Sequence, residues 1–89
     1  MFFIKNKGGE TVQKIRYNII LGRNIRNFRK AAKLTQEQVT AKMQLANCDI
    51  TRSTYAKMEA GLANIPARDL VCLSQILDCN LADFFQGIQ

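Results

Sequence analysis

Residues 34–61 constrain the fold of this 89-residue chain more than any other part, because they predict two short helices joined by a turn. Thr35 can cap the first of these helices with its hydroxyl, and Gln38, three residues later, can reach back as in a capping box. Val39 and Met43 are four residues apart and give this helix a narrow apolar stripe. The pattern therefore predicts a helix that starts after Thr35 and packs along one side.

The second predicted helix starts after Thr51, which can cap it, and stops at Gly61, the residue type best suited to a left-handed C-cap. Its inward residues would be Tyr55 and Met58. The ring of Tyr55 can fill a core position if its hydroxyl finds a partner, so we expect a core role, with a phosphate contact as the alternative. The outward face would carry the polar residues Arg52, Ser53 and Lys57.

The turn between these two helices is unusually long. Residues 44–50 separate Met43 from Thr51, whereas two helices of this kind are normally joined by about 3–4 residues. Leu45 could extend the first helix by a turn, and residues 47–49 could form the bend. The angle of the second helix is therefore left open by the sequence.

The order and spacing of these segments resemble the Cro/repressor-type helix-turn-helix family, often called the XRE family, of phage and bacterial transcription regulators. Leu34-Thr35-Gln36-Glu37-Gln38 looks like the opening of the first motif helix, and Arg52-Ser53-Thr54 followed by Glu59 looks like the second. Residues 21–29 and 70–85 resemble the family's first helix and its two closing helices. The resemblance implies an all-α fold, a compact five-helix bundle of the lambda-repressor-like DNA-binding type.

The resemblance also implies a partner, double-stranded DNA, whose major groove admits one helix and presents a distinct pattern for each base pair. Arg52 would donate two hydrogen bonds to a guanine, Lys57 would meet a guanine or a phosphate, and Thr54 could reach a base edge or a phosphate. Gln36 would hold a phosphate oxygen with its amide and the nearby backbone N–H groups. The implied DNA-binding residues are Gln36, Arg52, Ser53, Thr54 and Lys57.

Two further expectations come from the same resemblance. In the family, the arginine that matches Arg29 forms a partly buried ion pair with the glutamate that matches Glu59, which would lock the first helix to the second half of the motif. Ala60 and Leu62 depart from the family, which often has polar or basic residues there that hold the DNA backbone. Phosphate contacts would then come from elsewhere, including the basic first helix.

Apolar residues at helical spacing predict helices on both sides of the motif. The first would run from a cap at about Asn18 to about Ala32, and another would follow Pro66, which suits a helix start. The first helix would bury Leu21, Ile25, Phe28 and Ala32. The later one would bury Leu70, Leu73 and Leu77, with Val71, Cys72 and Ile76 broadening the stripe.

A last short helix is predicted near the end of the chain. Asn80 with Asp83 three residues later resembles a cap, and Leu81 with the two phenylalanines that follow would close the core. Phe84 and Phe85 cannot easily both point inward, so one of them is available for a dimer contact.

We expect one domain, residues 17–89, preceded by a flexible basic arm, residues 1–16. The arm contains Gly8-Gly9 and little periodicity. Its basic residues could follow a DNA backbone or groove, residues 2–4 could pack on a neighbouring subunit, or the arm could be a solvated tail. The apolar opening is interrupted at Lys5, too early for a signal peptide or a membrane span, so we expect a cytoplasmic protein.

The charge of +6 is uneven, because nine Lys or Arg residues and one acidic residue precede position 34, whereas four and six follow it. This pattern fits a nucleic-acid surface, or simply a soluble basic domain. Three cysteines without close pairs, and no histidine, argue against a metal centre. Cys72 and Cys79 fit buried positions, whereas Cys48 lies in the polar interval and could be exposed. Thiol redox sensing is disfavoured, since nothing near these cysteines except the general basicity would lower a thiol pKa.

The sequence leaves two candidate functions. The first is a homodimeric, sequence-specific transcriptional repressor that occupies an operator of two half-sites about one helical turn apart. The second is a protein-interaction module, such as an antitoxin-like partner, that keeps the fold without strong DNA binding. An enzyme is disfavoured, because the acidic residues are scattered and no phosphate-binding glycine loop is present, and no cofactor or small-molecule substrate is indicated.

Overall fold

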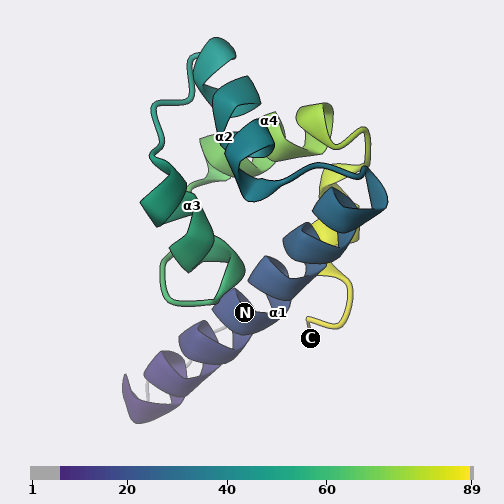
Figure 1. The fold of residues 1–89 in the computed structure, drawn as a ribbon. Coiled ribbons are helices and arrows are strands. Elements are labelled where there is room, and N and C mark those ends of the chain that lie inside the picture. Colours follow the sequence, from purple (N-terminus) through teal and green to yellow (C-terminus); the bar gives the residue numbers. More distant parts are fainter. Residues whose placement is uncertain (1–6, 89) are drawn as a thin grey trace.

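The computed structural model describes the backbone of residues 7–88 and the side chains of residues 16–88, and it shows an all-helical domain (Figure 1). Within this range it contains no strand. The elements are α1 (Lys7–Ala31), α2 (Gln36–Leu45), α3 (Arg52–Glu59), α4 (Ala67–Ile76) and a short 3-10 helix, η1 (Leu81–Phe85). The expected all-α bundle with five helical elements is confirmed.

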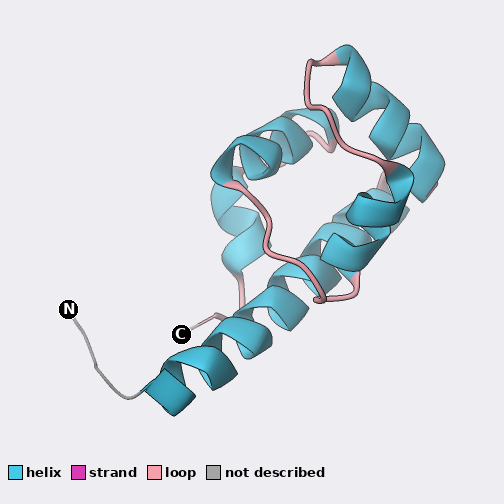
Figure 2. Cartoon of the chain, turned by 90° about the vertical axis from the view of Figure 1, so that its left-hand side faces the viewer, coloured by secondary structure: helices cyan, strands magenta, loops and turns pink. Residues whose placement is uncertain are grey.

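Helix α1 forms the long side of the molecule, and the other elements gather around its C-terminal half (Figure 1). α3 and η1 pack against α1, while α2 packs against both α3 and α4. The first turns of α1 extend beyond the rest of the fold in both views (Figures 1 and 2). None of the helices within residues 7–88 combines the length and hydrophobicity that a membrane crossing requires.

The start of α1 differs from the sequence-based expectation, since the helix begins at Lys7 rather than near Asn18. Asn18 lies inside this helix and therefore does not cap its start, and its Nδ2 donates a hydrogen bond to Oδ1 of Asn64 at 3.0 Å. Each residue added to an existing helix gains one hydrogen bond, so the helix can continue past a residue that favours a cap. Residues 7–16 of the expected arm thus belong to α1, and residues 1–6 lie outside the described residues.

The core is formed by buried residues of all five helical elements and of the turn before α3. The rings of Phe28 and Phe84 meet edge to face, with centroids 5.7 Å apart. Three expectations are wrong. Ala32 lies in the turn after α1 and is exposed, and Val71 is exposed on the outer side of α4. Leu81, which was expected to close the core, is 39% exposed at the start of η1. The expected residues that are buried are Leu21, Ile25, Val39, Met43, Tyr55, Met58, Leu70, Cys72, Leu73, Leu77 and Phe84.

The helix ends follow the predicted caps. Oγ1 of Thr35 accepts from the backbone N–H of Gln38 at 3.1 Å, and Oε1 of Gln38 accepts from the backbone N–H of Thr35 at 2.9 Å. The backbone N–H of Thr54 donates to Oγ1 of Thr51 at 3.1 Å. Asp83 accepts from the backbone N–H of Asn80 at 3.2 Å. These contacts place the start of each of the three elements.

Gly22 marks the closest approach of α1 to α3. A Cβ atom at this position would lie 2.3 Å from the carbonyl oxygen of Met58 and 2.6 Å from that of Glu59. Real Cβ atoms essentially never come this close to a backbone oxygen. The glycine therefore allows α1 to pack directly on the backbone at the end of α3.

Candidate nucleic-acid interface

Four of the five predicted DNA-binding residues lie together on α3. Arg52, Ser53, Thr54 and Lys57 are exposed, whereas Tyr55 and Met58 on the other side of the helix are buried. The side chain of Thr54 also contacts the cap, with 3.0 Å between its Oγ1 and that of Thr51. The helix thus presents a polar face to solvent while its apolar face is held in the core.

The long turn before α3 is ordered by local contacts. α2 continues to Leu45, as considered from the sequence. Asn47 then adopts a left-handed conformation with φ of 67°. Nε2 of Gln44 donates to the carbonyl oxygen of Ile50 at 2.8 Å, and this hydrogen bond links the two ends of the turn. The expectation that Cys48 could be exposed is wrong, because Cys48 is only 3% exposed. Cys48 and Ile50 anchor the turn in the core.

The carboxylate of Glu59 joins α1, α2 and α3 at one point. It accepts from Nε of Arg29 at 2.7 Å and from Nη2 of the same guanidinium at 3.1 Å. It also accepts from Nε2 of Gln36 at 3.0 Å and from the hydroxyl of Tyr55 at 2.5 Å. Arg29 donates a further bond to the carbonyl oxygen of Leu34 at 2.9 Å. The expected ion pair is confirmed, and it belongs to a larger buried network.

The network explains how a tyrosine occupies a core position of α3. Tyr55 is fully buried, with 0% of its surface exposed, and its hydroxyl has a charged acceptor. A buried hydroxyl without a partner would be costly, but this one donates to a carboxylate. The core role expected for Tyr55 is therefore confirmed, and the alternative of a phosphate contact is not compatible with its burial.

Burial and hydrogen bonds together shift the pKa values of Glu59 and Tyr55. Burial alone would raise the pKa of Glu59, but hydrogen bonds from Arg29, Tyr55 and Gln36 outweigh it and lower that pKa. Burial raises the pKa of the Tyr55 hydroxyl well above its ordinary value, and the hydrogen bond to Glu59 raises it further. The native fold therefore favours an ionised Glu59 beside a neutral Tyr55.

The shifted pKa of Tyr55 predicts a loss of stability at high pH. A tyrosine in the unfolded chain ionises at a pKa of about 10, whereas the folded protein holds Tyr55 protonated. The stabilisation is complete below that pH and is lost as the pH rises above it, by up to about 1.4 kcal/mol per pH unit. Urea unfolding between pH 8 and 11 should show this slope, and Tyr55→Phe should reduce it. An equal slope in both proteins would contradict the prediction.

Gln36, the fifth predicted residue, lies apart from the exposed set on α3. Its side chain is half-buried, and its amide is engaged by Glu59. An amide nitrogen carries two N–H groups, so one remains after this contact. The backbone N–H groups of Gln36 and Glu37 are in the first turn of α2, where the helix supplies no acceptor. The remaining amide N–H of Gln36 and these backbone N–H groups can therefore still donate to an anion, while the contact with Glu59 fixes the orientation of the amide.

A shallow cleft of about 190 Å³ opens beside Gln36, between α1 and α3. Arg26 lines it together with Gln36 and Ala60, and Arg26 is exposed. The sequence-based expectation assigned phosphate contacts to the basic first helix as a whole and did not single out Arg26. Its position one helical turn before Arg29 was the available signal, because residues three apart share a helix face.

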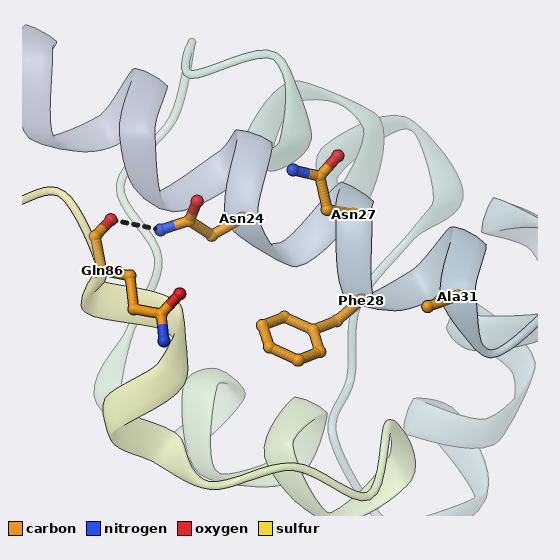
Figure 3. Close-up of a pocket in the computed structure, with 5 residues that line it drawn as sticks. All are labelled: Asn24, Asn27, Phe28, Ala31 and Gln86. Atoms are coloured by element: carbon orange, nitrogen blue, oxygen red, sulfur yellow. Dashed lines mark hydrogen bonds between the residues drawn. The ribbon is translucent and has the colours of Figure 1, made fainter.

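A second hollow, of about 240 Å³, lies between α1 and the C-terminal segment (Figure 3). Nδ2 of Asn24 donates to the carbonyl oxygens of Phe84 at 2.7 Å and Gln86 at 2.8 Å. Phe28 and Asn27 complete the lining with Ala31 (Figure 3). These two hydrogen bonds of Asn24 attach the C-terminal segment to α1. We therefore assign Asn24 a structural role in this hollow.

A helix-turn-helix family model matches residues 25–84, which include the C-terminal part of α1, the α2–α3 pair, α4 and most of η1. The chain belongs to the Cro/repressor-type helix-turn-helix family. This family consists of DNA-binding regulators, which are typically not enzymes. Searches against curated proteins and against solved structures give no significant match.

Proposed function

We propose that this helix-turn-helix protein is a sequence-specific transcriptional repressor that inserts α3 into the major groove of double-stranded DNA. The observation that carries the proposal is the exposed polar face of α3, with Arg52, Ser53, Thr54 and Lys57, on a helix whose other face is buried. A rigidly held helix with base-reading side chains on its free side is what major-groove recognition requires. Binding would act by occupation of an operator.

The side chains of α3 differ in the contacts that they can offer. Arg52 is the first residue of the helix, and its guanidinium can donate two hydrogen bonds to O6 and N7 of a guanine. Lys57 lies more than one turn later and can meet a guanine or a phosphate. Ser53 and Thr54 can reach a base edge or the backbone, and Gln36 supplies a phosphate contact at the start of α2.

We further propose that the protein acts as a homodimer in the cytoplasm. Members of this motif class commonly bind two half-sites about one helical turn apart. Phe84 is fully buried, whereas Phe85 next to it is 41% exposed. Phe85 and the half-exposed Leu81 therefore offer an apolar surface for a second subunit.

The proposal is tested by selecting bound sequences from a random duplex library at near-physiological salt. The parent protein should enrich a palindrome, and Arg52→Ala should lose about 1–3 kcal/mol of discrimination at the guanine that Arg52 contacts. Arg68→Ala, which removes an exposed arginine from α4, is the matched control and should select the same sequence as the parent. If Arg52→Ala keeps both the affinity and the sequence preference, α3 is not the reading helix.

A protein-interaction module is the second candidate, and the end of α3 favours it. Ala60 and Leu62 replace the backbone-holding residues common in the family, and Leu62 is 77% exposed. An exposed leucine of this kind is suited to a protein contact. The two functions differ in their salt response, because DNA binding through several phosphates weakens steeply with added salt whereas an apolar contact does not. If no sequence is enriched, the interaction module becomes the better candidate.

A further inference from the structure

Two cysteines far apart in the sequence line one cavity of the folded protein. The cavity, of about 310 Å³, lies between the turn that follows α2 and the outer part of α4. Cys48 reaches it from the turn, and Cys72 reaches it from the middle of α4. Both cysteines are reduced and almost completely buried, at 3% and 5% exposure.

The backbone on both sides of the pair is fixed. The backbone N–H of Cys48 donates to the carbonyl oxygen of Met43 at 2.8 Å, and the left-handed Asn47 before it turns the chain inward. Cys72 lies inside a regular helix, so its side chain direction is set by α4. Local structure on both sides therefore holds the two cysteines at one cavity, with their side chains within hydrogen-bonding reach of each other.

We infer that Cys48 and Cys72 form a reversible intramolecular disulfide, which locks the turn before α3 to α4. The reaction needs an oxidant of the peroxide class. One thiolate attacks a peroxide oxygen and becomes a sulfenic acid, and the second thiol then attacks its sulfur and releases water. In total the two thiols lose two electrons and two protons, and hydrogen peroxide becomes two waters.

The pKa of the Cys72 thiol determines how fast this disulfide can form, and the cavity determines whether the two sulfurs can meet. Burial and a hydrogen bond with Cys48 raise the pKa of the Cys72 thiol to about 11, so little thiolate is present at neutral pH and oxidation should be slow. A disulfide brings the sulfurs to about 2 Å from each other, and the cavity beside them leaves room for this shift. Cys79 does not line this cavity, which makes it an internal reference for thiol reactivity.

The test treats the full chain with hydrogen peroxide and then alkylates the remaining thiols in denaturant before mass spectrometry. We expect a monomer that has lost two hydrogen atoms, with the peptides of Cys48 and Cys72 joined and Cys79 alkylated. Cys79→Ser should give the same joined peptides, whereas Cys48→Ser should not. Oxidation of protein that is already denatured should lose this pairing preference.

The locked form should also be more stable than the reduced form. A disulfide between these positions closes residues 49–71 into a loop and restricts the unfolded chain, so the melting temperature should rise by at least about 5 °C and return after reduction with dithiothreitol. The inference is overturned if the folded protein links Cys79 as often as Cys72. It is equally overturned if the joined protein melts below the reduced one, since the native fold would then not accommodate the bond.

Discussion

Replacing Glu59 by alanine is expected to lower the free energy of unfolding by about 3–5 kcal/mol. The carboxylate accepts hydrogen bonds from Arg29, Gln36 and Tyr55, so its removal leaves a buried guanidinium and a buried hydroxyl without this acceptor. Breaking a buried pair by removing one partner costs more than removing both, because the remaining charge stays unpaired. A small domain has only about 5–15 kcal/mol to lose, so a change of this size removes a large part of its stability.

Urea unfolding of three variants separates this effect from simple loss of charge. Glu37→Ala removes an exposed carboxylate from α2 and should change the stability by no more than about 0.5 kcal/mol. Glu59→Gln keeps the shape but not the charge and should fall between the parent and Glu59→Ala. A loss of less than about 1 kcal/mol in Glu59→Ala would mean that Arg29 leaves the core and regains water, and the network would then not hold α1 to α3.

The second large effect is expected from Gly22→Ala. The added Cβ would meet two backbone carbonyl oxygens at the end of α3, the nearer at 2.3 Å, and a backbone cannot rotate out of the way as a side chain can. Overpacking of this kind typically costs about 1–3 kcal/mol and occasionally more, and we expect the upper end of this range or above. The direction of the change in stability is informative. Alanine in a helix is otherwise favoured over glycine by about 1 kcal/mol, so a loss of stability would have to come from the close contact with α3.

Asn27→Ala is the matched control for Gly22→Ala. Asn27 is exposed on the same helix, so its replacement by alanine should leave the stability nearly unchanged or raise it slightly. Thermal unfolding of the two variants measures the difference directly. If Gly22→Ala melts at or above the temperature of the parent, α1 does not approach α3 as closely as described.

Local hydrogen bonds explain why the sequence predicted the helix starts so well. The caps at Thr35, Thr51 and Asn80 depend on groups three residues apart, so the sequence itself contains both partners. The beginning of α1 was not predictable in this way. Asn18 looks like a cap in the sequence, but the helix continues through it, and its side chain contacts the distant Asn64 instead.

Contacts between distant segments explain the other differences. The burial of Cys48 in the turn follows from its position against α4, and a turn has no periodicity that would reveal an inward side chain. The engagement of Gln36 likewise depends on Glu59, which belongs to another helix. The ion pair between Arg29 and Glu59 was predicted only because the family resemblance supplied the pairing. The DNA-binding roles on α3 rest on the same resemblance and await the experiments above.

The cap of α3 has an electrostatic consequence for the proposed DNA complex. Thr51 caps the helix with a neutral hydroxyl, and the first turn contains no acidic residue. The helix dipole therefore leaves its partial positive charge uncompensated at the end where Arg52 begins the exposed face. An aspartate would cap this helix at least as well, but it would cancel that charge and repel phosphate. The threonine thus stabilises the helix end without opposing the approach of a polyanion.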